Sequence, residues 1–366
     1  MRKLRDVLLR MLCLVSVLTA GVTAANPSAH AAAPDRWGFA VVDVTSGVPS
    51  LSHEAGSWPT GSTVTVAAIA TGQVFVRFPQ IGIPFGGVVH VTAITQEPKW
   101  CQVQQWGPWG ADEGVAVQCY RYGGTPEFTS FSVVFSESSG RLNAPQAFGY
   151  IHSEPVSGGD PVASSYNSMG VTNRVTRVAP GLWQVTLPGL GSAAQTGGFQ
   201  VTAVNAVRPA RCKPASWTPS TTAHTLYVIC HDATTTRIDT GWTLTYQRER
   251  AITGGALPPT TFAYTFDKLP TTPGPYSPTP AAINYNSLAS TNDIRTAGPG
   301  LRLVTFPAVG SLPDNVQATA YGVNPEYCNL LATWTTTGGT ATVHDACYNG
   351  LTRSDQSSFV TYVSAR

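Results

Sequence analysis

The sequence predicts an all-β protein of three tandem β-sandwich modules, each stapled by one disulfide of its own. The first observation is that the cysteines after the leading segment form three pairs, at the same place in a unit of about 110 residues: Cys101 and Cys119, Cys212 and Cys230, Cys328 and Cys347. The second is that apolar and polar residues alternate at a period of two in matching places of each unit. Since no segment shows helical periodicity, we expect three tandem repeats of one β module.

The first two strands of the pattern recur in every unit. The opening strand carries an aromatic, a small and a second aromatic residue, at Trp37-Gly38-Phe39, Phe148-Gly149-Tyr150 and Phe262-Ala263-Tyr264. A middle strand is expected over residues 74–79, 183–188 and 302–307. Each ends in proline, which removes a ladder donor and stops the strand. Positions that recur in this way are those that the fold requires.

A third strand alternates apolar and polar residues in every unit. Its apolar face carries Val89, Val91 and Ala93, matched by Phe199, Val201 and Ala203 and by Val316, Ala318 and Ala320. The intervening residues are His90 and Thr92, Gln200 and Thr202, Gln317 and Thr319. We expect this polar face to meet solvent. His90 is therefore interpreted as a solvated surface histidine rather than a catalytic one, because the other units place glutamine there.

A cysteine hairpin and a closing strand complete each unit. The closing strand is expected to begin twelve residues after the second cysteine, at Phe131, Trp242 and Phe359. The predicted modules are residues 36–139, 148–250 and 262–366. The links at 137–147 and 251–261 are rich in Ser, Gly and Pro and are interpreted as short spacers. The sequence leaves open whether the modules pack together or move independently.

Repetition also predicts the disulfide pairing. Six cysteines allow 15 connectivities in general, but only pairing within the module gives three copies of one fold the same bridge. Closing a loop of this size contributes about 3 kcal/mol in the chain-entropy model. A metal site would need His or Cys neighbours that recur at short spacing, and none do, so we expect no metal.

The first residues predict a secretory signal peptide over 1–31. Basic residues come first, an apolar run follows over 11–24, and Ala29-His30-Ala31 offers small residues for cleavage near Ala31. The alternative, a membrane anchor, needs about 20 apolar residues, and this run is shorter. Cys13 lies in the apolar run and is expected to leave with the signal. The expected location is therefore secreted and extracellular.

The charge of the chain excludes some partners. Removing the signal takes the formal net charge from +2 to −1, because the four basic residues of that segment outnumber Asp6, its single acid. Charged residues make up 11% of the chain, against about 25% in ordinary domains. Nothing in this balance favours nucleic acid or an anionic membrane. No second stretch is long enough to cross a bilayer, so we expect no membrane insertion.

Searching for catalytic motifs yields no catalytic residue and no cofactor site. The sequence has no Gly-x-Ser-x-Gly elbow, no His-Glu-x-x-His, no phosphate loop and no calcium loop. The dipeptides His231-Asp232 and His344-Asp345 are not catalytic pairs, because neighbours on a strand point to opposite faces. Asp345 occupies a position that the alternation buries in the other units. A carboxylate there needs hydrogen bonds or a bulge, and a local site is the alternative.

Two tryptophans distinguish the first module. Trp106, Trp217 and Trp334 recur after the first cysteine and are interpreted as core residues, whereas Trp100 and Trp109 have no counterpart. With Asp112 and Glu113 they have the composition of a sugar-binding face, where flat rings meet a pyranose and carboxylates meet its hydroxyls. The alternative, which we favour, is that these rings cover the sheet edge or pack on the next module.

The matching hairpin loops of the other modules differ in chemistry. Module two carries Arg208, Arg211 and Lys213, and module three carries Asn324, Glu326 and Tyr327. Unlike loops on a shared frame are typical of a binder with several ligands.

The three modules and the alanine-rich signal resemble the uncharacterised secreted tandem-repeat proteins of actinobacteria. That resemblance implies an extracellular location and assigns no activity. We expect a non-enzymatic binding or surface-interaction protein, with an extracellular polysaccharide or cell-wall surface as partner. Two alternatives stay open. One is a secreted glycan-directed hydrolase whose acid and base come from separated strands, and the other is a structural cell-surface component.

Overall fold

The computed structural model describes residues 35–44, 50–84, 86–155, 162–254 and 259–366. The described residues all belong to one compact unit. The regular secondary structure of the described residues is β-strand, apart from one short 3₁₀ turn, Ala281–Ile283. No helix in these ranges has the length and apolar character needed to cross a membrane. The expected signal peptide, residues 1–31, lies outside the described residues.

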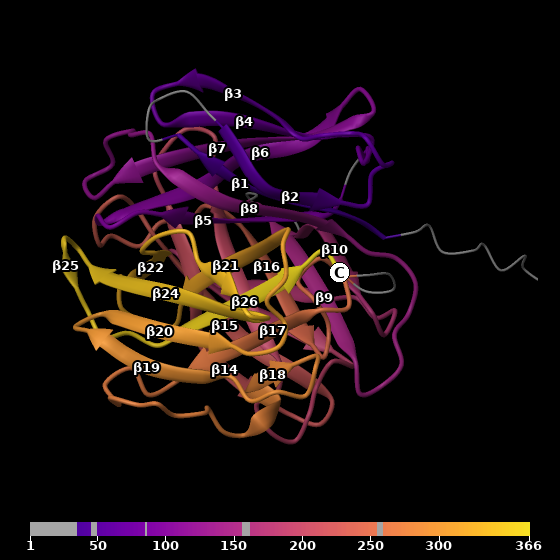
Figure 1. The fold of residues 1–366 in the computed structure, drawn as a ribbon, viewed down its shortest axis with the longest axis vertical. Coiled ribbons are helices and arrows are strands. Elements are labelled where there is room, and N and C mark those ends of the chain that lie inside the picture. The colour runs from indigo at the N-terminus through magenta and orange to yellow at the C-terminus, as the bar shows by residue number, and fades with distance from the viewer. Residues whose placement is uncertain (1–34, 45–49, 85, 156–161, 255–258) are drawn as a thin grey trace, which may run out of the picture. The chain divides into compact units, whose positions relative to one another are not determined.

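Module one is a sandwich of two antiparallel four-stranded layers, in the orders β2-β1-β8-β5 and β3-β4-β7-β6 (Figure 1). Its strands are β1 (Arg36–Asp43), β2 (Ser50–Gly56), β3 (Thr65–Ala70), β4 (Gln73–Phe78), β5 (Val88–Ile94), β6 (Lys99–Trp109), β7 (Asp112–Arg121) and β8 (Ser130–Glu137). The inward residues of both layers form one apolar core, which includes Phe78, Val89 and Val117. The period-two pattern therefore predicts the core face correctly.

Modules two and three repeat this strand order, and module three adds two short strands, β23 and β25, that pair with β24. The layers of module two are β10-β9-β16-β13 and β11-β12-β15-β14, and those of module three are β18-β17-β26-β21 and β19-β20-β24-β22. The strands of module two are β9 (Ala147–Ser153), β10 (Val162–Asn167), β11 (Arg174–Ala179), β12 (Leu182–Pro188), β13 (Gly198–Val204), β14 (Arg211–Pro219), β15 (Ala223–His231) and β16 (Gly241–Arg248). Those of module three are β17 (Phe262–Asp267), β18 (Asn284–Asn286), β19 (Asp293–Gly298), β20 (Leu301–Phe306), β21 (Asp314–Ala320), β22 (Tyr327–Leu330), β23 (Thr335–Thr337), β24 (Thr340–Asn349), β25 (Thr352–Arg353) and β26 (Ser358–Ser364).

The disulfide prediction is confirmed. Each module closes its own hairpin, through bridges Cys101–Cys119, Cys212–Cys230 and Cys328–Cys347. The two cysteines of each bridge are paired directly across antiparallel strands. Each bridge thus links two neighbouring strands of one layer covalently. This link holds the adjoining hairpin loops in place.

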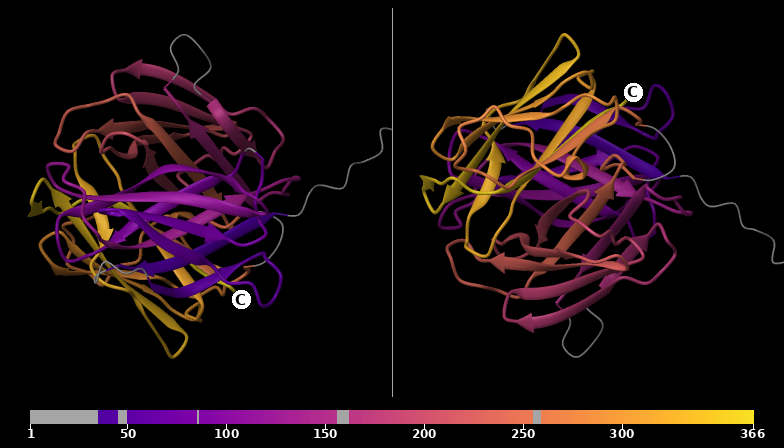
Figure 2. Two further views of the ribbon diagram at one scale, coloured as in Figure 1. Left: turned by 90° about the horizontal axis from the view of Figure 1, so that it is seen from above. Right: turned by 90° about the horizontal axis from the view of Figure 1, so that it is seen from below.

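The three modules are joined to one another in a cycle, and Figure 2 shows their successive colour ranges side by side. At three equivalent positions, a backbone N–H group donates a hydrogen bond to a carbonyl oxygen of another module. The acceptor is always the residue two places after the first cysteine of that module. The pairs are Thr95 to Leu330 at 2.7 Å, Asn205 to Val103 at 2.9 Å, and Gly322 to Pro214 at 3.0 Å. Each module therefore donates one such bond and accepts one. A closed cycle of equivalent contacts is a pseudo-threefold arrangement.

The polar faces of the third strands form the interior of this assembly, so the expectation that they meet solvent was wrong. His90 is only 2% exposed. Its Nδ1 lies 3.1 Å from Oγ1 of Thr202, and its Nε2 lies 2.7 Å from Oγ1 of Thr245. Thr92 donates to Oε1 of Gln317 at 2.8 Å. Alternation identifies the two faces of a strand, but a polar face paired with polar partners can be buried as well as an apolar one.

Candidate functional site

The residues singled out in module one lie at opposite ends of one strand, β6. Trp100 is paired with Tyr120 across β7, and Trp109 is paired with Asp112. A bulge between Val103 and Gln105 shifts the register, so both tryptophans project from the same side of the layer. Their surroundings differ, because Trp100 is 4% exposed and Trp109 is 60% exposed.

Trp109 is the only exposed aromatic side chain in the part of the chain that the structure describes. Its ring meets the half-buried ring of Phe75 edge to face, with the centroids 5.5 Å apart. Phe75 lies over Gly114, where a Cβ atom would stand 2.6 Å from Cζ of the ring. A glycine in β7 therefore lets the phenylalanine lie flat on the sheet beside Trp109. The two rings form an aromatic face on the outer side of β4, β6 and β7.

Fixed polar groups border this aromatic face. Arg77 donates to Oδ2 of Asp112 at 2.5 Å, and the backbone N–H of Gln80 donates to Oδ1 at 3.0 Å. Both carboxylate oxygens of Asp112 are thus held in place. Gln105 is exposed on the same side of β6. The face offers rings, one guanidinium, one carboxylate and one amide to a ligand.

Glu113 points to the other side of the sheet, into the sandwich. It is fully buried, and its Oε2 accepts the backbone N–H of Ile83 at 3.0 Å. Burial raises its pKa to about 7, against the lowering effects of the Ile83 hydrogen bond and the charge of Arg36. Glu113 therefore does not share the face of Trp109 and Asp112, because neighbours on a strand project to opposite sides.

Trp100 packs on the other modules, which was the alternative interpretation. Its indole Nε1 donates to the carbonyl oxygen of Ala210 at 3.1 Å. The guanidinium carbon of Arg211 lies 4.9 Å from its ring centroid, and the ring of Tyr327 lies 5.7 Å away. Trp100 and Trp109 thus do not form a shared sugar platform. Of the four predicted binding residues, the structure keeps Trp109 and Asp112 together and separates Trp100 and Glu113 from them.

The recurring tryptophans behave largely as expected. Trp217 and Trp334 are buried in the cores of modules two and three. Trp106 is half-buried, and its ring lies 4.4 Å from that of His152 in module two. The contrast between shared and unshared tryptophans therefore identifies Trp217 and Trp334 as core rings, but it does not tell the buried Trp100 from the exposed Trp109.

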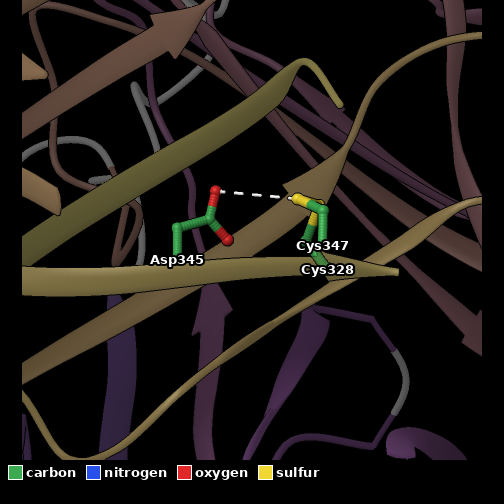
Figure 3. A group of neighbouring side chains, drawn as sticks. All are labelled: Cys328, Asp345 and Cys347. Atoms are coloured by element: carbon green, nitrogen blue, oxygen red, sulfur yellow. Dashed lines mark hydrogen bonds between the residues drawn. A yellow bond between two sulfur atoms is a disulfide. The ribbon is translucent and has the colours of Figure 1, made fainter. Parts of the chain in front are cut away.

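Asp345 is buried as the alternation predicts, beside the disulfide of module three (Figure 3). Its Oδ2 accepts the Ser358 hydroxyl at 2.5 Å and lies 4.0 Å from Sγ of Cys347. Burial raises the pKa of Asp345 to about 7. Because Cys328 and Cys347 are joined to each other, they offer no thiolate, and the group supplies one carboxylate rather than a metal-ligand set.

Phe75 is the member of the aromatic face that sequence reasoning missed. The signal was present, since Phe75 alternates with the buried Val74 and Val76 and must therefore face outward. No protein-family model matches the chain, and comparisons with curated proteins and with solved structures find no match either.

Proposed function

We propose that this chain is an extracellular, non-enzymatic carbohydrate-binding protein, and that the aromatic face of Trp109 and Phe75 is its binding surface. The observation that carries the proposal is the 60% exposure of Trp109, a large apolar ring that a protein ordinarily covers. Exposed aromatic rings on a rigid sheet are typical of recognition surfaces. The secreted location rests on the predicted signal peptide and agrees with three disulfides.

The chemistry of the face suits a sugar. The flat indole can cover the apolar side of a pyranose, and the neighbouring polar groups, Arg77, Asp112 and Gln105, can exchange hydrogen bonds with its hydroxyls. Arg77 and Asp112 already hold each other at 2.5 Å. Because two strands and a disulfide fix this frame, little side-chain freedom is lost on binding.

Binding is favoured over hydrolysis by the placement of the acids. A glycosidase needs two carboxyl groups on either side of the scissile bond, and one of them must have a raised pKa. Glu113 and Asp345 have pKa values of about 7. Both are fully buried, so a polysaccharide cannot reach them. Burial also raises the pKa of Glu137, but Glu137 lies on β8, in the layer opposite the aromatic face.

The test is retention of the mature protein on insoluble polysaccharides and purified cell walls. Trp109→Ala should weaken retention at least about tenfold, since a central aromatic carries much of the energy of such a surface. Its melting temperature should stay within a few degrees, because an exposed ring adds little to the core. Leu351→Ala is the matched control, because Leu351 is also exposed but lies in module three.

Three outcomes would contradict the proposal. One is that the wild-type protein is retained on none of the materials. Another is that Trp109→Ala is retained as well as Leu351→Ala. The third is that soluble sugars accumulate in the same tube, which would favour the hydrolase alternative.

A further inference from the structure

A cavity of about 50 Å³ lies where the three modules meet. It is lined by equivalent positions of all three, including Val91, Val201 and Ala318 from the third strands and Cys101, Cys212 and Cys328 from the hairpins. Such a volume has room for a few water-sized groups. It is too small for a sugar, so it is a different site from the aromatic face.

The residue before the first cysteine of each module lines this cavity, and the three copies are unlike. They are Trp100, Arg211 and Tyr327. The guanidinium carbon of Arg211 lies 4.9 Å from the centroid of the Trp100 ring and 4.5 Å from that of Tyr327. The rings position the cation and partly compensate its lost hydration.

Arg211 is nevertheless a buried cation with unused donors. It is 7% exposed. Its Nη2 donates to the carbonyl oxygen of Thr234, whereas Nε and Nη1 have no hydrogen-bond partner among the described residues. Unpaired N–H groups on a buried charge are costly, and they indicate a ligand with acceptor character.

The acids Asp232 and Glu326 act on Arg211 through their charges, but neither accepts a hydrogen bond from Nε or Nη1, and Asp232 is not among the residues that line the cavity. Lys213 and Glu326 pair with each other, with Nζ and Oε2 3.1 Å apart, and their charges cancel. His231 is paired with Arg211 across the strands. Burial and the charges of Lys213 and Arg211 lower its pKa to about 4, so it is neutral at pH 7. The cavity lining therefore carries a net charge of about +1.

We propose that this cavity binds a small monovalent anion, such as chloride, which accepts from the free N–H groups of Arg211 and supplies the missing negative charge. The anion then acts as a structural ligand that ties the three modules together. Because it binds the folded chain and not the unfolded chain, it stabilises the fold in proportion to its concentration.

The test uses the mature protein, with chloride as the probe and sodium gluconate holding ionic strength constant. Gluconate is chosen because it is too large for the cavity. The melting temperature of the wild type should rise by about 2 °C for each tenfold rise in chloride above its Kd. Arg211→Met should abolish that dependence while filling the space between the rings. Arg177→Met, at an exposed arginine, should keep the full dependence.

A second measurement keeps the proposal testable where Arg211→Met does not fold. Crystals of the wild type soaked in bromide should show an anomalous peak beside the guanidinium of Arg211. The proposal is overturned by a wild-type melting temperature that does not respond to chloride, by equal responses in Arg211→Met and Arg177→Met, or by a bromide-soaked cavity that holds no anomalous peak.

Discussion

Replacing Asp345 with asparagine should remove a pH dependence that the buried carboxyl imposes on stability. The carboxyl accepts the Ser358 hydroxyl, while its Oδ1 has no hydrogen-bond partner within the described ranges. Two charged groups act on it, Asp267 and Arg302, and these pair with each other at 2.7 Å. Burial is the largest cause of its raised pKa. An amide preserves the acceptor for Ser358 and carries no charge at any pH.

The size of the effect follows from the two pKa values. The carboxyl titrates at about 7 in the folded chain and at 3.8 in the reference state. Between these values the folded chain keeps a proton that the unfolded chain has lost, so the free energy of unfolding falls as the pH rises from about 4 to 7 and is flat above that range. A difference of about three pKa units corresponds to about 4 kcal/mol.

The assay is urea unfolding of wild type and Asp345→Asn from pH 4 to 8.5. The two proteins should have nearly equal stability at pH 4, and the variant should become more stable by about 4 kcal/mol at pH 8. The other titrating groups are present in both proteins, so their contributions cancel when the unfolding free energy of the wild type is subtracted from that of the variant. Asp239→Asn should instead become less stable relative to the wild type as the pH rises, because the hydrogen bond from Arg177 lowers the pKa of Asp239. A stability difference for Asp345→Asn that does not change with pH would refute the reasoning.

Two further predictions concern buried rings. Burial lowers the pKa of His90 from 6.5 to about 3, so its contribution to stability is lost as the pH falls below 6.5. His90→Gln, the residue that both other modules use, should keep the fold and reduce the loss of stability between pH 6.5 and 4, as measured by urea unfolding; an unchanged acid sensitivity would contradict this. Trp217→Ala, at a buried core ring, should cost about 3 to 5 kcal/mol; a thermal denaturation midpoint as little changed as that of Trp109→Ala would contradict its core role.

The internal repeat made the fold predictable. Three copies of one pattern locate the strands, the bridges and the apolar faces, because each position is tested three times. The same pattern misplaced His90, since alternation shows which face of a strand is polar but not whether that face meets water or another polar face. The packing of the modules depends on hydrogen bonds between side chains of different modules, such as that from Thr92 to Gln317. The alternation of polar and apolar residues along one strand does not show which residues pair in this way.

The candidate sites were predictable in part. Trp100, Arg211 and Tyr327 occupy equivalent positions in the three modules but differ in residue type, so the sequence shows that each is specific to its own module. That they meet at one cavity follows only from the cyclic packing. Composition predicted Trp109 and Asp112 as candidate binding residues, and alternation would have added Phe75 to the same face. Glu113 was included because it is next to Asp112 in the sequence, although neighbours on a strand face opposite ways.

Hydrogen exchange at three backbone amides tests the cyclic packing most directly. The N–H groups of Thr95, Asn205 and Gly322 donate to carbonyl oxygens of another module. If the modules form one body, these amides should exchange as slowly as strand amides inside the modules, since opening them requires the cycle to come apart. Exchange at the rate of exposed loop amides at all three positions, with the strands inside each module still protected, would contradict the account.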